Sequence, residues 1–163
     1  MAHFLSVANR KGGVGKSTTA VMLAHAFAAW GGMRVLVMDL DSQCNASLIL
    51  MGGEAWSQAR KKGLTISDYF FDLFDETYPE PRDFLAHNVG DVRLANGKPL
   101  AISLLPGSLM LEDVQGELYV REARQSKDPE VVGQRVRGRL ERLLRRFEQS
   151  YDLVILDCPP GLS

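Results

Sequence analysis

Three glycines, two lysines and three hydroxyl residues stand together in NRKGGVGKSTTA, residues 9–20. Gly12, Gly13 and Gly15 let the backbone bend so that successive amide groups point at an anion. A helix that begins directly after such a turn adds its positive N-terminal end to the same place. The segment therefore predicts a phosphate-binding turn.

The side chains after the last glycine fit a nucleoside triphosphate. Lys16 is placed to reach the β- and γ-phosphates, the Ser17 hydroxyl is a ligand for Mg²⁺, and Thr18 stands beside it for another phosphate. The pattern GxxxxGK[ST] is met only in its last part, because its first glycine falls on Asn9 or Arg10. A glycine turn can also serve packing alone, but a strand before it and a helix after it favour nucleotide binding.

Acidic residues occur at the ends of two other apolar segments. Asp39 and Asp41 follow the run 33–38, and Asp157 ends the run 151–156. Any single aspartate at a strand end can be a turn residue. Because ligands of open α/β sheets sit at the carboxyl ends of the strands, the three together predict a metal and water site.

The elements that must position these residues form a βαβ unit. Residues 3–9 are typical of a buried strand, 16–30 of a helix closed by two glycines, and 33–40 of a strand covered on both faces. A strand, helix and strand in forty residues predict an α/β fold with a mostly parallel sheet flanked by helices.

The rest of the chain predicts further elements around this unit. Residues 52–99 show little periodicity and are expected to be an elaborated surface region. The other expected elements are a short helix at 65–74, a strand at 99–107, helices at 108–124 and 130–149, and a strand at 151–157.

Length and composition bound the functional class. The 163 residues suit one domain, and a net charge of -1 excludes attraction to nucleic acid by bulk charge. No apolar run approaches a membrane span and no signal pattern is seen, so a cytoplasmic location is expected. Cys44 and Cys158 form no CxxC or Cys/His cluster, which favours packed thiols over a disulfide or metal site.

Four segments resemble a known family in order along the chain. KGGVGKST with Lys11 resembles the deviant Walker A motif of the ParA/MinD family of P-loop ATPases. VLVMDLDSQCNAS (35–47) is similar to its second motif, YDLVILDCPP (151–160) to its Walker B strand, and LLPGS (104–108) to a further strand end. The segment DLDSQCNAS is more similar to the ParA branch of the family than to the MinD branch.

The resemblance implies roles for matching positions. Lys11 would cross a nucleotide-sandwich dimer to the partner's phosphates, while Lys16 acts on its own subunit's phosphates. Asp41 would position the attacking water. Residues 11–18, which include Val14, would hold ATP, and the Mg²⁺ site would comprise Ser17, Asp39 and Asp157.

The implied function is that of a P-loop NTPase which forms an ATP-dependent homodimer and hydrolyses ATP slowly unless a ParB-like protein stimulates it. It would act in plasmid or chromosome partitioning, with nucleoid association. Alternatives are a MinD-like ATPase acting at a membrane and a fragment that binds nucleotide without turnover. An iron-sulfur carrier shares the Lys11 turn but would need paired bridging cysteines.

Two departures from the family pattern stand out. Ser42 replaces the usual proline, so the loop after Asp41 is expected to be less rigid. The chain also ends six residues after Asp157, where family members continue, so 1–163 is expected to be the N-terminal portion of a single ATPase domain.

One basic segment belongs to none of the motifs above. Residues 121–146 hold nine Arg or Lys against four acids. Such a run on an amphipathic helix is usually a solvated face. The alternative is a patch that binds DNA phosphates without reading sequence.

Overall fold

One five-stranded sheet organises the computed structural model, which describes residues 1–11, 13 and 15–160. Its spatial order is β1, β5, β2, β4, β3, and every neighbouring pair is parallel except β3 with β4. The predicted mostly parallel sheet is confirmed. The strands are β1 (His3–Val7), β2 (Val35–Asp39), β3 (Ala86–His87), β4 (Ile102–Leu105) and β5 (Leu153–Asp157).

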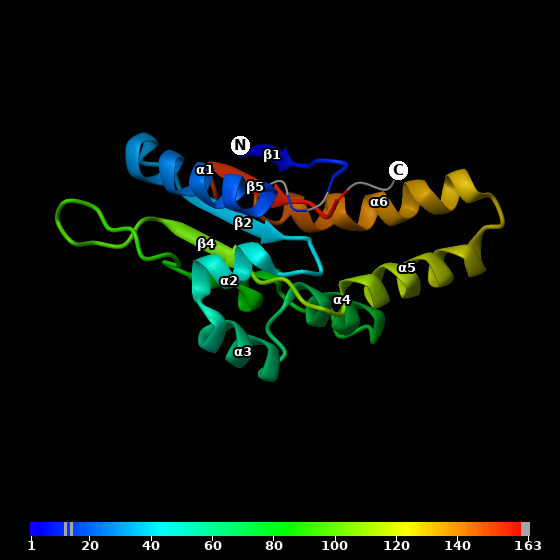
Figure 1. The fold of residues 1–163 in the computed structure, drawn as a ribbon. Coiled ribbons are helices and arrows are strands. Elements are labelled where there is room, and N and C mark those ends of the chain that lie inside the picture. The colour runs from blue at the N-terminus through cyan, green and yellow to red at the C-terminus, as the bar shows by residue number, and fades with distance from the viewer. Residues whose placement is uncertain (12, 14, 161–163) are drawn as a thin grey trace.

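Helices cover both faces of the sheet (Figure 1). They are α1 (Lys16–Gly31), α2 (Asn45–Met51), α3 (Gly53–Lys61), α4 (Ile66–Phe74), α5 (Leu111–Gln125) and α6 (Pro129–Arg145), with a 3-10 turn η1 (Pro81–Phe84). The four helices predicted from the sequence are present with shifts of a few residues at their ends. Helices α2 and α3 were not predicted. Helices α5 and α6 form an antiparallel hairpin that extends beyond the carboxyl ends of the strands.

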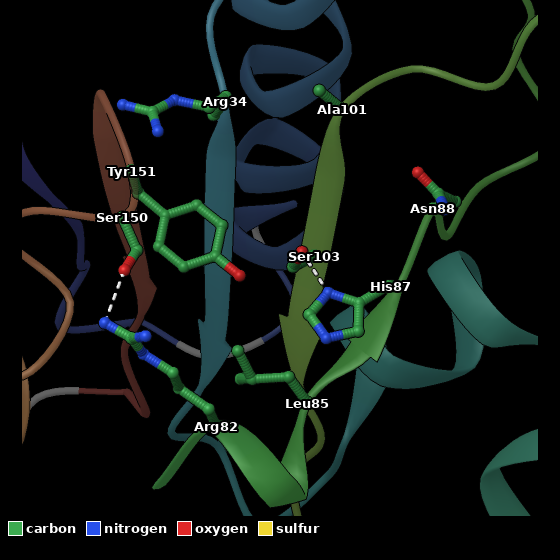
Figure 2. Close-up of a pocket in the computed structure, with 9 residues that line it drawn as sticks. All are labelled: Arg34, Arg82, Leu85, His87, Asn88, Ala101, Ser103, Ser150 and Tyr151. Carbon is green, nitrogen blue, oxygen red and sulfur yellow. Dashed lines mark hydrogen bonds between the residues drawn. The ribbon is translucent and has the colours of Figure 1, made fainter.

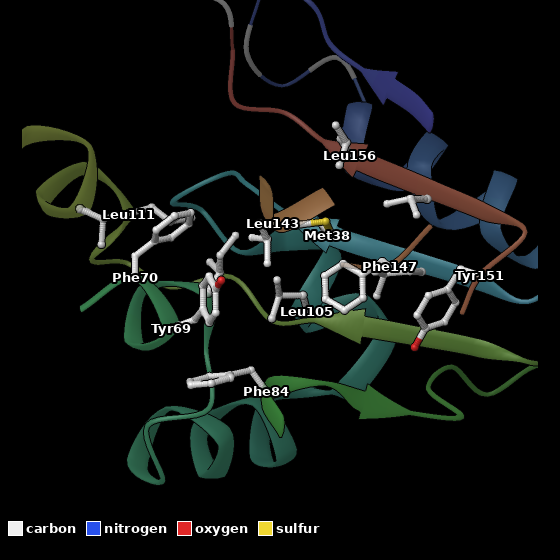
Figure 3. Packing of buried hydrophobic residues seen from close by; sticks show 14 of the residues in the cluster. Met38, Tyr69, Phe70, Phe84, Leu105, Leu111, Leu143, Phe147, Tyr151 and Leu156 are labelled. Atoms are coloured by element: carbon white, nitrogen blue, oxygen red, sulfur yellow. The ribbon is translucent and has the colours of Figure 1, made fainter. Parts of the chain in front are cut away.

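Alternation along the central strands separates two hydrophobic cores. In β2, Val35 and Val37 pack against α1 and α2, whereas Leu36 and Met38 face the opposite side. All four side chains are fully buried. This burial on both faces explains why the strand is a continuous apolar run. The second core, packed with aromatic residues from α4 to the start of β5, is shown in Figure 3.

Strand β1 differs from the expectation that residues 3–9 form a buried strand. It ends at Val7, and the side chains of His3, Phe4 and Ser6 are exposed. The reason is its place at the edge of the sheet, where it pairs with β5 and with no other strand of the described residues.

The range 52–99, expected to be a surface region, also supplies part of the core. Tyr69 and Phe70 of α4 and Phe84 of η1 are buried, with ring centroids 5.4 and 5.6 Å from Tyr69. Thr65 is the N-cap of α4 and forms a capping box with Asp68. The Thr65 hydroxyl accepts a hydrogen bond from the backbone amide of Asp68, and the Asp68 carboxylate accepts one from the backbone amide of Thr65. The amphipathic α4 is thus fixed against the sheet.

Parallel pairing gathers the functional loops at one edge. Val7 lies beside Asp157, and Asp157 lies beside Asp39, so β1, β5 and β2 end level with one another. Asp41 after β2 and Pro160 after β5 line one cavity together with Lys16 and Ser17 at the start of α1. Within the described residues, no helix is long and apolar enough to cross a bilayer.

Candidate nucleotide-binding site

The turn into α1 has the backbone that anion binding requires. Gly13 and Gly15 have φ of 71° and 81°, in the left-handed region that favours glycine. Gly15 is the N-cap of α1, and its carbonyl accepts hydrogen bonds from Thr19 N at 2.8 Å and Thr19 Oγ1 at 2.9 Å. No described side chain caps the first turn and no acid lies in it, so its amides remain available to an anion. Gly12 and Val14, also predicted, lie outside the described residues.

Most of the predicted nucleotide-binding residues line one cavity of about 380 Å³. Asp41, from the loop after β2, lies in the same wall. The full lining is Gly13, Gly15, Lys16, Ser17, Thr18, Asp41, Gln43, Asn45, Ile49 and Pro160. The sequence analysis missed the last four of these, which are Gln43, Asn45, Ile49 and Pro160. Gln43 and Asn45 could have been suspected, because they are polar residues of the segment that carries Asp41. Lys16 and Ser17 are themselves buried.

Asp157 is a buried carboxylate at the end of β5. Its side chain is fully buried, and neither carboxyl oxygen has a hydrogen bond among the described residues. Burial raises the pKa of Asp157, the nearby charge of Asp41 raises it further, and Ser17 and Lys16 oppose the shift. Because an unpaired buried charge is costly, this carboxylate suits a cation beside Ser17.

The donor set fits Mg²⁺ better than a metal held by protein ligands alone. The described residues contain no cluster of three carboxylate, histidine or cysteine side chains suited to a metal ion. Magnesium commonly uses one or two carboxylates and takes its other ligands from water and phosphate. Ser17 and Asp157 would supply one hydroxyl and one carboxylate, which agrees with this preference of Mg²⁺.

Asp41 and Asp39 stand two residues apart but face different surroundings. Asp41 Oδ1 accepts a hydrogen bond from Gln43 N at 2.9 Å, and the side chain borders the cavity of about 380 Å³. Asp39 is fully buried, and its Oδ2 accepts bonds from Ser47 N at 2.8 Å and Ser47 Oγ at 2.6 Å. Its Oδ1 accepts from Asp41 N at 3.3 Å. Asp39 is therefore placed to hold the loop, and its register partner on β5 is Asp157, another residue of the expected metal site.

Burial also sets the protonation of Asp39. Removal from water raises the pKa of Asp39 to about 6, with a further rise from the charge of Asp157. The hydrogen bonds from Ser47 and Asp41 oppose this rise. Two carboxylates on adjacent strands thus share a poorly solvated edge, where a cation is favourable.

Lys11 and Ser42 lie outside that cavity. Lys11 is exposed, and its backbone amide donates to Asn9 Oδ1 at 3.3 Å. Ser42, which stands in place of the usual proline, donates from its hydroxyl to Glu112 Oε1 at 3.0 Å. The loop after β2 is thereby tied to the first turn of α5.

A second cavity, of about 440 Å³, opens at the amino ends of the strands (Figure 2). Several of its polar groups already bond one another. Arg82 donates to Ser150 Oγ at 2.8 Å, and His87 Nδ1 lies 3.0 Å from Ser103 Oγ. It contains none of the predicted site residues. Its lining is Arg34, Arg82, Leu85, His87, Asn88, Ala101, Ser103, Ser150 and Tyr151.

The two cysteines are free thiols. Burial raises the pKa of Cys44 to about 12, and burial likewise raises the pKa of Cys158. Both are therefore protonated at neutral pH, which is unlike a reactive thiolate. They behave as the packed thiols predicted from the sequence.

Ion pairs occupy much of the basic segment 121–146. Five of its nine cations pair with carboxylates at 3.8 Å or less, and Glu122 serves two of them. The paired cations are Arg121, Arg135, Arg139, Arg145 and Arg146. The other four, which have no salt bridge among the described residues, are Arg124, Lys127, Arg137 and Arg142.

Comparison with known proteins shows which family the chain belongs to. A family model described as an AAA domain (AAA_31) matches residues 2–163. The chain is 35% identical over 159 residues to the chromosome partitioning protein ParA of Caulobacter vibrioides, covering 98% of this chain and 48% of that protein. It is 29% identical over 164 residues to the sporulation initiation inhibitor protein Soj of Bacillus subtilis, covering 100% of this chain and 52% of Soj.

A solved structure shares the fold and binds nucleotide. It is the cobyrinic acid a,c-diamide synthase of Mycobacterium smegmatis with bound ATP analog and magnesium, with a TM-score of 0.67 and 28% identity. The match covers 100% of this chain and 52% of that chain. The chain thus spans about half the length of the relatives it matches. The chain belongs to the AAA_31 family of AAA domains and, within the P-loop ATPases, to the ParA/MinD family.

Proposed function

We propose that this chain carries the phosphate-binding part of a ParA-type Mg-ATPase. ATP binds with its phosphates over the start of α1, where Lys16 contacts them. Ser17 ligates Mg²⁺ directly, and Asp157 holds it through water. The main support is the buried carboxylate of Asp157, which has no partner among the described residues and lies beside Ser17 and Lys16.

Phosphoryl transfer to water depends mainly on positioning and on neutralising charge. Bound Mg²⁺ supplies neutralisation of the β- and γ-phosphate charge. Lys16 adds a positive charge from the chain itself, and the first-turn amides of α1 add hydrogen bonds. Asp41 Oδ1 is held by the amide of Gln43, which fixes the carboxylate toward the cavity so that it orients the attacking water.

Lys11 acts on a second subunit in this proposal. Its side chain is exposed and lies outside the lining of its own cavity. In an ATP-dependent homodimer it reaches the phosphates bound by the partner, so that hydrolysis depends on dimerisation. A ParB-like protein stimulates the reaction, and the cellular role is DNA partitioning in the cytoplasm. The name of the Caulobacter relative, a chromosome partitioning protein, supports this role.

The nucleotide proposal is tested in the full-length protein by the affinity for a fluorescent ATP analogue and by phosphate release with and without Mg²⁺. Lys16→Ala should weaken binding at least about tenfold, because a charge-assisted phosphate contact is lost. Asp157→Asn should retain binding and lose the Mg²⁺-dependent hydrolysis. Lys61→Ala, at an exposed lysine of α3, is the control. Parent-like binding and hydrolysis in both site variants would refute the proposal.

The second-subunit role of Lys11 needs a separate variant. Lys11→Ala should keep nucleotide affinity and lower the partner-stimulated rate by about a thousandfold, the scale of a charge supplied across an interface. Arg10→Ala, which removes the adjacent exposed cation, is the control. A stimulated rate that survives Lys11→Ala would contradict the mechanism.

A further inference from the structure

Three buried groups join the end of β2 to α2 and to the loop after β4. Asp39 Oδ2 accepts hydrogen bonds from the amide and hydroxyl of Ser47, and Ser47 Oγ in turn accepts from Gly107 N at 2.8 Å. Asp39 and Ser47 are both fully buried. We call this arrangement the Asp39–Ser47–Gly107 bridge.

The bridge has no spare room. A Cβ at Gly107 would lie 2.9 Å from Asp39 Cγ, closer than real Cβ contacts allow, and a tight 3.1 Å from Asp39 O. Glycine is therefore required by the approach of the loop to Asp39. The carbonyl of Gly107 also accepts a hydrogen bond from Trp56 Nε1 at 3.1 Å, so α3 is tied to the same point.

The other side of the bridge leads to the nucleotide cavity. The second carboxyl oxygen of Asp39 accepts from the amide of Asp41, whose side chain borders that cavity. Helix α2, which Ser47 anchors, begins at Asn45, and Asn45 lies in the same cavity wall. The bridge thus fixes both ends of the short segment that contains Asp41.

We propose that Ser47 and Asp39 are positioning residues for Asp41, and that they couple its place in the site to the loop after β4. This inference rests on the proposed ATPase function. Neither Ser47 nor Asp39 is in the lining of the cavity that Asp41 borders. They set the direction from which the Asp41 carboxylate meets the attacking water.

Two substitutions disturb the bridge by unrelated means. Ser47→Ala removes the hydroxyl that links Asp39 to Gly107, and Gly107→Ala pushes a methyl group against Asp39. Each should lower kcat about 10- to 100-fold, because small misplacement of a reacting group has that effect. The affinity for the ATP analogue should stay within about twofold, since Lys16 and the α1 amides are untouched.

Matched controls exist for both changes. Ser67 is also a buried serine, and its hydroxyl has no hydrogen-bond partner among the described residues, so Ser67→Ala should leave kcat unchanged. Gly116, within α5, has nothing within 4 Å of an added Cβ, so Gly116→Ala should be silent as well. Hydrogen exchange provides a second readout, because Ser47→Ala should speed exchange at Gly107 and in the loop of Asp41 together.

The outcomes separate this inference from the proposed function. If the parent protein neither binds nor hydrolyses ATP, the proposed function fails first. If the parent is active and Ser47→Ala and Gly107→Ala keep its kcat, the positioning role is refuted. A proportional loss of affinity with unchanged kcat, or loss of folding in both variants, would assign the bridge to cavity shape or to stability alone and would also refute it.

Discussion

Replacing Asp39 with asparagine should remove a defined part of the pH dependence of folding. In the folded protein the pKa of Asp39 is raised from 3.8 to about 6. The folded state therefore binds this proton more tightly than the unfolded chain does. Its contribution to stability is fully present below pH 3.8 and is lost as the pH rises through 6. The shift of about two units corresponds to about 3 kcal/mol at about 1.4 kcal/mol per unit.

The measurement is the free energy of unfolding from urea titrations between pH 4 and 7.5. The parent protein should lose about 2.4 kcal/mol more than Asp39→Asn across this range, because a small part of the contribution is already lost at pH 4. Asp152 does not interfere, because its ion pair with Arg34 lowers the pKa of Asp152 to about 2. Asp91→Asn, at an exposed aspartate, should follow the parent. Parallel curves for the parent and Asp39→Asn would show that Asp39 titrates normally and would refute the reasoning.

Two further predictions concern the core and the basic segment. Phe147 is fully buried and packs edge-on against Tyr151, so Phe147→Ala should lower the free energy of unfolding by about 3–5 kcal/mol, and a loss below about 1 kcal/mol would contradict its core position. Replacing Arg137 and Arg142 together with alanine should weaken binding to nonspecific duplex DNA and reduce the salt slope by about 2. Binding that equals that of Arg93→Ala, a control at an exposed arginine outside this segment, would assign both arginines to solvent.

Strong local patterns explain which parts of the fold could be predicted. The run that forms β2 is apolar at every position because both faces of the strand are covered, and α1 begins at the residue after the last glycine of the turn. Spacing alone predicted that the lysine and serine at that start bind phosphate and metal, and the structure places both in the wall of one cavity. The convergence of Asp41 with them followed from the rule that strand ends face the ligand.

Other features depend on tertiary structure and left no local signal. Helix α2 has seven residues and is followed at once by Gly52 with a φ of 77°, so it is too short for periodicity to show. Strand β1 is as apolar as a buried strand, and its edge position depends on which strand lies beside it. The hydrogen bond between Asp39 and Ser47 spans eight residues, which matches neither helix nor strand spacing.

A crystal structure of the full-length protein with Mg²⁺ and a non-hydrolysable ATP analogue would test the central claim most directly. The phosphates should lie over the start of α1, with the ammonium group of Lys16 in contact with them. The metal should be bound by the Ser17 hydroxyl and joined to Asp157 through water. Phosphates bound instead in the cavity of Figure 2, or a metal without contact to Ser17, would contradict the assignment.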